Sequence, residues 1–225
     1  MINMPDEQNP ATDTFLSQGQ GDRFDRWVEF FGILVMSLAT IATAWCAYQA
    51  ALWGGDESKF YFEASAAQIE ASQNENQARQ RTTVHVGLFS NYLNALAEDN
   101  AELAEFYYTR FPQELRSATD AWLATNPLDD ANAPSSPFDM PQYQLAEEVE
   151  AARYAALATE KFDAANDADE HADNYVLLTV IFATVLFFSG ISGKFQWQVL
   201  DAAVLSIAVI VLLIGLVLLL QMPIQ

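Results

Sequence analysis

Three long stretches of this sequence contain no charged side chain, and they restrict the possible folds more than any other feature. Lys, Arg, Asp and Glu are absent from residues 30–55, 174–193 and 202–225. An apolar run of this kind is typical of a membrane-spanning helix, because about 20 residues rising 1.5 Å each cross the hydrocarbon layer. One such run could be a buried core helix, but the rest of a 225-residue chain could not cover three. We therefore expect an all-α membrane protein with spans at residues 27–53, 175–193 and 202–221.

The charged residues are concentrated elsewhere. Residues 1–22 are polar, contain two prolines and predict a flexible tail. Residues 56–173 predict an acidic, helical extramembrane domain inserted between the first and second spans. The formal net charge of the whole chain is −20. This charge argues against nucleic acid and against anionic lipid headgroups as partners.

The inserted domain shows coiled-coil-like spacing. The pattern is helical over residues 56–110, and its apolar positions recur at steps of three and four. The predicted seam comprises Phe62, Ala66, Ile69, Gln73, Asn76 and Gln80 upstream, then Phe89, Leu93, Leu96, Asn100, Leu103 and Tyr107. The polar upstream residues predict a weak or hydrated interface there.

Two further helices are expected in this domain. Pro112 opens one that extends to about Thr125, with Leu115, Ala118, Trp122 and Leu123 as its inner face. A proline-rich loop follows. Asp139 is then placed to cap a helix that begins at Pro141 and continues without a break into the second span.

The first span carries polar and small residues. Ala39, Thr43 and Ala47 begin a stripe that repeats every four residues, and Gln49 lies towards the end of the span. Small residues allow close contact between helices in lipid, and a polar side chain there commonly forms an interhelical hydrogen bond. The alternative is that Thr43 and Gln49 line a pore. We favour helix packing.

An aromatic cluster formed by Phe106, Tyr107, Tyr108 and Phe111 is denser than one seam requires. It predicts either a partner-binding surface or the core beneath the Pro112 turn, and the sequence leaves both interpretations open.

No motif for catalysis, nucleotide binding or metal binding is evident. Asp167, His171 and Asn174 share one helical face and could hold a divalent cation, but a solvated acidic face explains them better. We therefore expect no enzymatic activity, no cofactor and no metal.

Basic residues near the spans indicate an orientation. Arg23 and Arg26 precede the first span, and Lys194 lies in the turn between the last two. The positive-inside rule places these flanks in the cytoplasm and the inserted domain outside.

Three strings, ATAWCAYQAALWGG (42–55), SPFDMPQY (136–143) and DNYVLLTVIFATVLFFSGIS (173–192), are distinctive. The chain resembles, through these strings, a group of uncharacterised bacterial inner-membrane proteins. The resemblance implies that location and this architecture, and it implies no activity or site residue.

Two functions remain under consideration. The first is a non-enzymatic scaffold or accessory protein whose extracytoplasmic domain associates with another membrane or periplasmic protein, or with itself. The alternative is a subunit of an oligomeric cation channel with an acidic vestibule.

Overall fold

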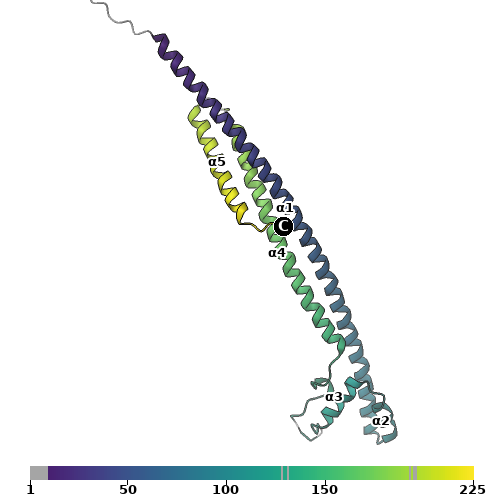
Figure 1. Cartoon of the computed structure of the whole chain (residues 1–225). Coiled ribbons are helices and arrows are strands. Elements are labelled where there is room, and N and C mark those ends of the chain that lie inside the picture. Colours follow the sequence, from purple (N-terminus) through teal and green to yellow (C-terminus); the bar gives the residue numbers. More distant parts are fainter. Residues whose placement is uncertain (1–9, 128, 131, 193, 195–196) are drawn as a thin grey trace, which may run out of the picture. The chain divides into compact units, whose positions relative to one another are not determined.

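The protein is built from helices (Figure 1). A computed structural model describes residues 10–127, 129–130, 132–192, 194 and 197–225. The elements are α1 (Pro10–Ala97), α2 (Ala101–Tyr108), α3 (Gln113–Leu123), the 3₁₀ turn η1 (Pro137–Asp139), α4 (Ala146–Ile191) and α5 (Gln198–Gln221). Among the described residues there is no strand, which confirms the predicted all-α class.

Three of the helices, α1, α4 and α5, are long and apolar enough to cross a membrane, within the residues that the structure describes. In their most apolar segments only 28%, 28% and 17% of the residues are buried inside the chain. Large side chains such as Ile33, Val180 and Leu213 therefore face outward. Lipid solvates such a surface, whereas water does not.

The ends of the long helices differ in part from the sequence prediction. Of the predicted tail at residues 1–22, residues 1–9 lie outside the described residues, and α1 already begins at Pro10. Proline is tolerated there because the first amides of a helix have no partner within it. Helix α4 continues without a break into the second apolar run, as predicted.

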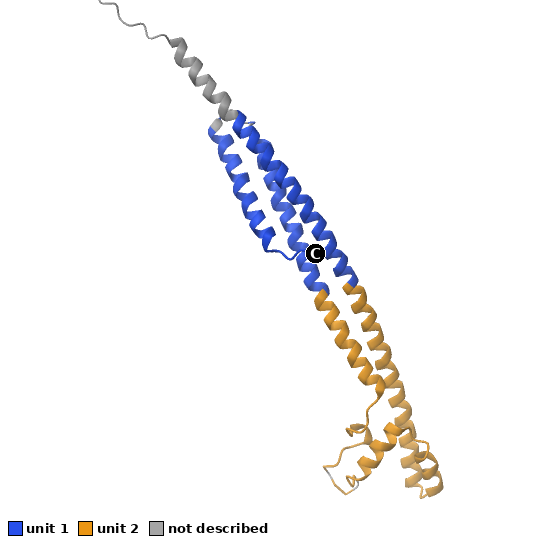
Figure 2. Ribbon diagram, viewed as in Figure 1, with its two compact units in different colours: residues 1–59, 165–225 blue, residues 60–164 orange. Residues whose placement is uncertain are grey.

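The chain divides into two compact units, which Figure 2 colours separately. Unit 1 contains residues 1–59 and 165–225, and unit 2 contains residues 60–164. The long helices α1 and α4 contribute residues to both.

The core of unit 1 lies between α1, α4 and α5. On α1 the buried residues follow alternating steps of four and three. Large and small buried side chains of α4 and α5 complete the core. The cluster consists of Val35, Ala39, Ala42, Cys46, Tyr175, Leu178, Phe182, Val185, Ala208 and Leu212. At one end the Ser189 hydroxyl donates a hydrogen bond of 2.7 Å to the Gly32 carbonyl, which joins α4 to α1.

Unit 2 contains an antiparallel pair formed by α1 and α4. Lys161 Nζ lies 3.0 Å from Glu63 Oε2, and Arg81 Nη2 lies 3.1 Å from Glu147 Oε1. The buried positions of α1 between these two ion pairs are alanines, which let the helix backbones approach closely. They are Ala64, Ala67, Ala71 and Ala78.

The predicted upstream seam is not the face of α1 that packs on α4. Phe62, Ala66, Ile69, Gln73, Asn76 and Gln80 are all exposed, and the buried face lies two residues further along at Ala64, Ala71 and Ala78. Two residues correspond to about 200° around an α-helix, so the predicted seam faces away from α4. The sequence prediction favoured the larger apolar residues, whereas the helix pair uses alanine.

The downstream seam is also interrupted. Helix α1 ends at Ala97, where Asp99 adopts a positive φ of 53° and the Asn100 amide donates to the Ala95 carbonyl at 2.9 Å. This is the Schellman arrangement that closes a helix. The Asn100 side chain then caps α2 by accepting a hydrogen bond from the Leu103 amide. Leu93 and Leu96 are exposed.

The last turns of α1 and the segments that follow α1 in unit 2 share an aromatic core, here called the tip core. Phe89 contacts the rings of Trp122 and Phe138 at centroid distances of 5.5 and 5.9 Å, both edge to face. The Trp122 indole donates a hydrogen bond of 2.7 Å to the Pro134 carbonyl, which holds the proline-rich loop. The tip core consists of Phe89, Phe111, Leu115 and Trp122, with Leu88, Tyr92, Tyr107, Tyr108, Phe138 and Met140 packed against them.

Two local predictions for this region are wrong. Leu123 is exposed, and Thr119 takes its place on the inner face of α3. Asp139 does not cap a helix at Pro141. Its carboxylate accepts hydrogen bonds from the hydroxyls of Ser135 and Ser136 within the loop, and α4 begins only at Ala146.

Candidate functional site

The aromatic cluster at residues 106–111 belongs largely to the tip core. Phe111 is only 4% exposed, and Tyr107 and Tyr108 pack against that core. The Tyr108 hydroxyl donates a hydrogen bond to Asp120 Oδ1 at 2.5 Å. Phe106 differs, because it is 48% exposed and its ring lies 3.6 Å from the Arg110 guanidinium carbon. Of the four residues predicted for partner binding, Phe106 is the one whose ring remains available.

The small-residue stripe of α1 does not stay on one face. Ala39 is fully buried, Thr43 is half-buried and Ala47 is exposed. A step of four residues turns the helix by about 400°, so the stripe drifts by about 40° at each repeat. The Thr43 hydroxyl donates to the Ala39 carbonyl at 2.8 Å, within its own helix. Ala39 thus belongs to the unit 1 core, whereas the hydroxyl of Thr43 is used within its own helix.

Gln49 is fully buried and holds the segment that follows α5. Its side-chain oxygen accepts a hydrogen bond of 3.1 Å from the Gln225 amide, and its side-chain nitrogen donates to the Gln225 carbonyl at 3.3 Å. The Tyr175 hydroxyl donates to the Pro223 carbonyl at 3.0 Å, and the Gln225 side chain donates to Asp56. Gln49 therefore satisfies backbone groups of the segment that follows α5. The sequence suggested a contact with a neighbouring helix and did not indicate this segment.

His171 is explained by a ring contact. Its imidazole lies 4.6 Å from the Trp53 ring, while Asp167 and Asn174 are exposed. Within the described residues, no group of three or more His, Cys, Asp or Glu side chains could hold a metal ion.

Sequence reasoning assigned no role to His85, but the structure places it at the centre of a polar cluster in unit 2. His85 is 4% exposed, and its Nδ1 lies 2.9 Å from the Tyr143 hydroxyl, which donates to Thr82 Oγ1 at 3.4 Å. His85 and Tyr143 are 58 positions apart in the sequence, and Tyr143 belongs to the string SPFDMPQY. Only the turn through the tip brings them together.

An open pocket of about 340 Å³ borders this cluster and is lined by Gln77, Gln80, Arg81, Val84, His85 and Glu147. Glu147 pairs with Arg81 through Oε1, while its Oε2 is buried without a hydrogen-bond partner. The Arg81 side chain is half exposed, so this ion pair contributes at most about 1 kcal/mol. The lining of the pocket therefore includes one imidazole, one carboxylate and one guanidinium.

Burial lowers the pKa of the His85 imidazole, although the nearby carboxylates of Glu114 and Glu147 act in the opposite direction. The unfolded chain, in which His titrates near about 6.5, then binds a proton that the folded chain does not. The free energy of unfolding of unit 2 should therefore fall as the pH drops below about 6.5, by up to about 1.4 kcal/mol per pH unit. Above that pH this contribution is constant.

Hydrogen exchange of peptides covering residues 80–97, corrected for the intrinsic pH dependence of exchange, measures this effect. The His85→Gln variant should lose the slope between pH 7 and 5.5 and keep the losses at lower pH that come from carboxylates. An unchanged slope in this variant would mean that another group is responsible.

No protein-family model, no curated protein and no solved structure matches this chain. The resemblance to bacterial inner-membrane proteins stays a prediction from the strings quoted above.

Proposed function

We propose that this chain is a bacterial inner-membrane protein that crosses the membrane three times and associates with other protein chains through its helical domain, without catalysing a reaction. Support for the membrane location comes from the outward-facing apolar side chains of α1, α4 and α5. Exposing this apolar surface to water would cost a large amount of free energy, whereas exposing it to lipid has no such cost.

The orientation that we propose places the N-terminal flank and the turn between α4 and α5 in the cytoplasm. Arg26 and Lys194, which lie next to the spans on that side, are exposed. The positive-inside rule then places residues 56–173 outside the cytoplasm.

The association role rests on one observation. Unit 2 buries its own core, yet it leaves large apolar side chains exposed outside the predicted spans. Phe62 is 77% exposed, Ile69 57% and Val149 61%. Apolar side chains that gather on one face are typical of protein interaction sites, and Phe62 and Ile69 share a face of α1.

Native mass spectrometry of the full chain, released gently from its own membrane, tests this proposal. We expect each complex to contain more than one chain, either copies of this protein or this protein with a partner. A bare monomer, with hydrogen exchange showing that unit 2 is folded, would contradict the proposal. A uniform ring of four or more copies that conducts cations in liposomes would instead support the channel.

A further inference from the structure

The outer face of α1 in unit 2 carries a continuous row of uncharged, exposed residues, here called the outer stripe. Its positions alternate in steps of four and three from residue 62 to residue 94, about 48 Å along the helix axis. The stripe consists of Phe62, Ala66, Ile69, Gln73, Asn76, Gln80, Thr83, Gly87, Ser90 and Asn94. This 3.5-residue period is the spacing with which one α-helix packs along another.

The buried face of α1 keeps the same period two residues later, for example at Ala71, Ala78 and His85. The helix therefore has two seams on opposite sides. One of them is occupied by α4. The outer stripe has no occupant among the described residues, although its spacing is equally regular.

The charge distribution of unit 2 indicates the occupant. Residues 60–164 include 17 acidic and 6 basic side chains, a net charge of −11. Two copies that met through a charged face would repel each other, and a basic partner would be drawn to the acidic faces. The outer stripe has no charge at any of its ten positions. It is thus a face through which two acidic chains can approach closely.

Gly87 gives independent support. A Cβ added at Gly87 would meet no atom within 4 Å, so no contact inside the chain requires a glycine there. Glycine in an exposed helix costs about 1 kcal/mol relative to alanine. The close approach of a second helix would account for a glycine at position 87, because the absence of a side chain lets two backbones come near each other.

We propose that a second copy of this chain docks on the outer stripe, so that the two α1 helices form a parallel two-stranded coiled coil. The inference rests on the proposed function. Two copies with the same orientation in one membrane place their α1 helices parallel, and each stripe residue then faces its own counterpart. The amides of Gln73, Asn76 and Gln80 both donate and accept hydrogen bonds, so each can pair with an identical residue and fix the register.

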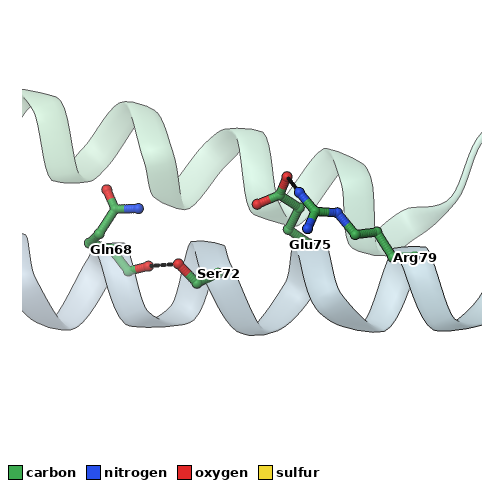
Figure 3. A network of polar contacts seen from close by, with 4 residues as sticks. All are labelled: Gln68, Ser72, Glu75 and Arg79. Atoms are coloured by element: carbon green, nitrogen blue, oxygen red, sulfur yellow. Dashed lines mark hydrogen bonds and ion pairs between the residues drawn. The ribbon is translucent and has the colours of Figure 1, made fainter.

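Cysteine cross-linking in membranes tests the dimer. Cys46, the one cysteine in the sequence, is replaced by alanine, and single cysteines are introduced by Gln73→Cys or Asn94→Cys on the stripe. The matched controls are Gln68→Cys and Glu75→Cys. Figure 3 shows both side chains on the side of α1 that borders α4. They line an open pocket to which Ala151, Ala152 and Ala155 of α4 also contribute.

We expect mild oxidation to form disulfide-linked dimers at both stripe positions at least about tenfold faster than at the controls, because a disulfide requires Cβ atoms about 4 Å apart. Equal rates at Gln73 and Gln68 would overturn the stripe as the interface. A third variant, Gln80→Cys, tests the direction of the pair. In an antiparallel pair only residues near the middle of the stripe lie opposite their own copies, so cross-linking at Gln80→Cys but not at Gln73→Cys or Asn94→Cys would overturn the parallel arrangement.

A second variant tests the stripe without a cross-linker at the altered residue. In the Asn94→Cys background, Asn76→Glu places two carboxylates opposite each other and should reduce the dimer yield at least about tenfold. Gln68→Glu adds the same charge off the stripe and should leave the yield unchanged. If the stripe cysteines link to a different protein, the second copy is excluded and the association function stands. If they link to nothing and native mass spectrometry finds a monomer, both proposals fail.

Discussion

Replacing Phe111 with alanine should unfold the tip of unit 2. Phe111 is nearly inaccessible and contacts Tyr92 and Tyr108 at ring-centroid distances of 5.6 and 5.8 Å. Truncating a buried aromatic side chain removes its burial and leaves a cavity, which together cost about 3–5 kcal/mol. A small helical tip has little stability beyond that amount. Hydrogen exchange of peptides from residues 101–125 should therefore become fast, while peptides from the apolar helices remain protected.

Phe106→Ala is the matched control, since it removes the same side chain five positions away. Phe106 is half exposed, and its contact with the Arg110 guanidinium contributes about 0.5–1 kcal/mol. The tip should stay folded in this variant. A loss of association without a loss of protection would give Phe106 the partner-binding role that the sequence suggested for the whole cluster. Equal unfolding by both substitutions would contradict the division between a buried Phe111 and an exposed Phe106.

The long helices could be predicted because their signal is local. An apolar run without charges identifies a candidate span whatever its neighbours are. Helices α4 and α5 end at Ile191 and Gln221, close to the predicted ends at residues 193 and 221, although α4 begins far upstream at Ala146. The end of α1 carried a local signal too, since an Asp-Asn pair suits a left-handed residue followed by a helix cap. This signal was overlooked because the apolar spacing typical of a helix continues on either side of Asp99.

The faces of the helices could not be predicted, because spacing alone does not identify a helix's neighbour. Both seams of α1 in unit 2 have the same period. The sequence favoured the one with Phe62 and Ile69, while α4 packs on the one with Ala64 and Ala71. Alanine contributes little burial per residue but allows the backbones to approach. Whether the burial of large side chains or the close approach of the backbones dominates depends on the partner helix. The contact between His85 and Tyr143 could not be predicted for the same reason, because spacing alone did not show which face of α1 is buried.

Among the glycines of unit 1 whose surroundings the structure describes, Gly215 has the least room for a side chain. A Cβ there would lie 2.8 Å from Phe182 Cε1 and 3.1 Å from Cζ. The Phe182 ring is fully buried in the unit 1 core, so it cannot swing into open space. Gly215→Ala must therefore push α5 away from α4 or distort the ring, at a cost of about 1–3 kcal/mol, and Gly215→Leu must cost more.

The reactivity of Cys46 provides the measurement, because its thiol is fully buried in the same core. A maleimide should label Cys46 of the detergent-solubilised Gly215→Leu variant at least about tenfold faster than that of the unaltered protein, since about 1.4 kcal/mol of destabilisation raises the open population tenfold. Gly190→Leu adds the same side chain where no atom lies within 4 Å, and it should leave the labelling rate unchanged.

Combining Gly215→Ala with Phe182→Leu makes room for the added methyl group, so the pair should be less destabilising than the sum of the two changes. Strict additivity would mean that the ring of Phe182 does not limit the approach of α5.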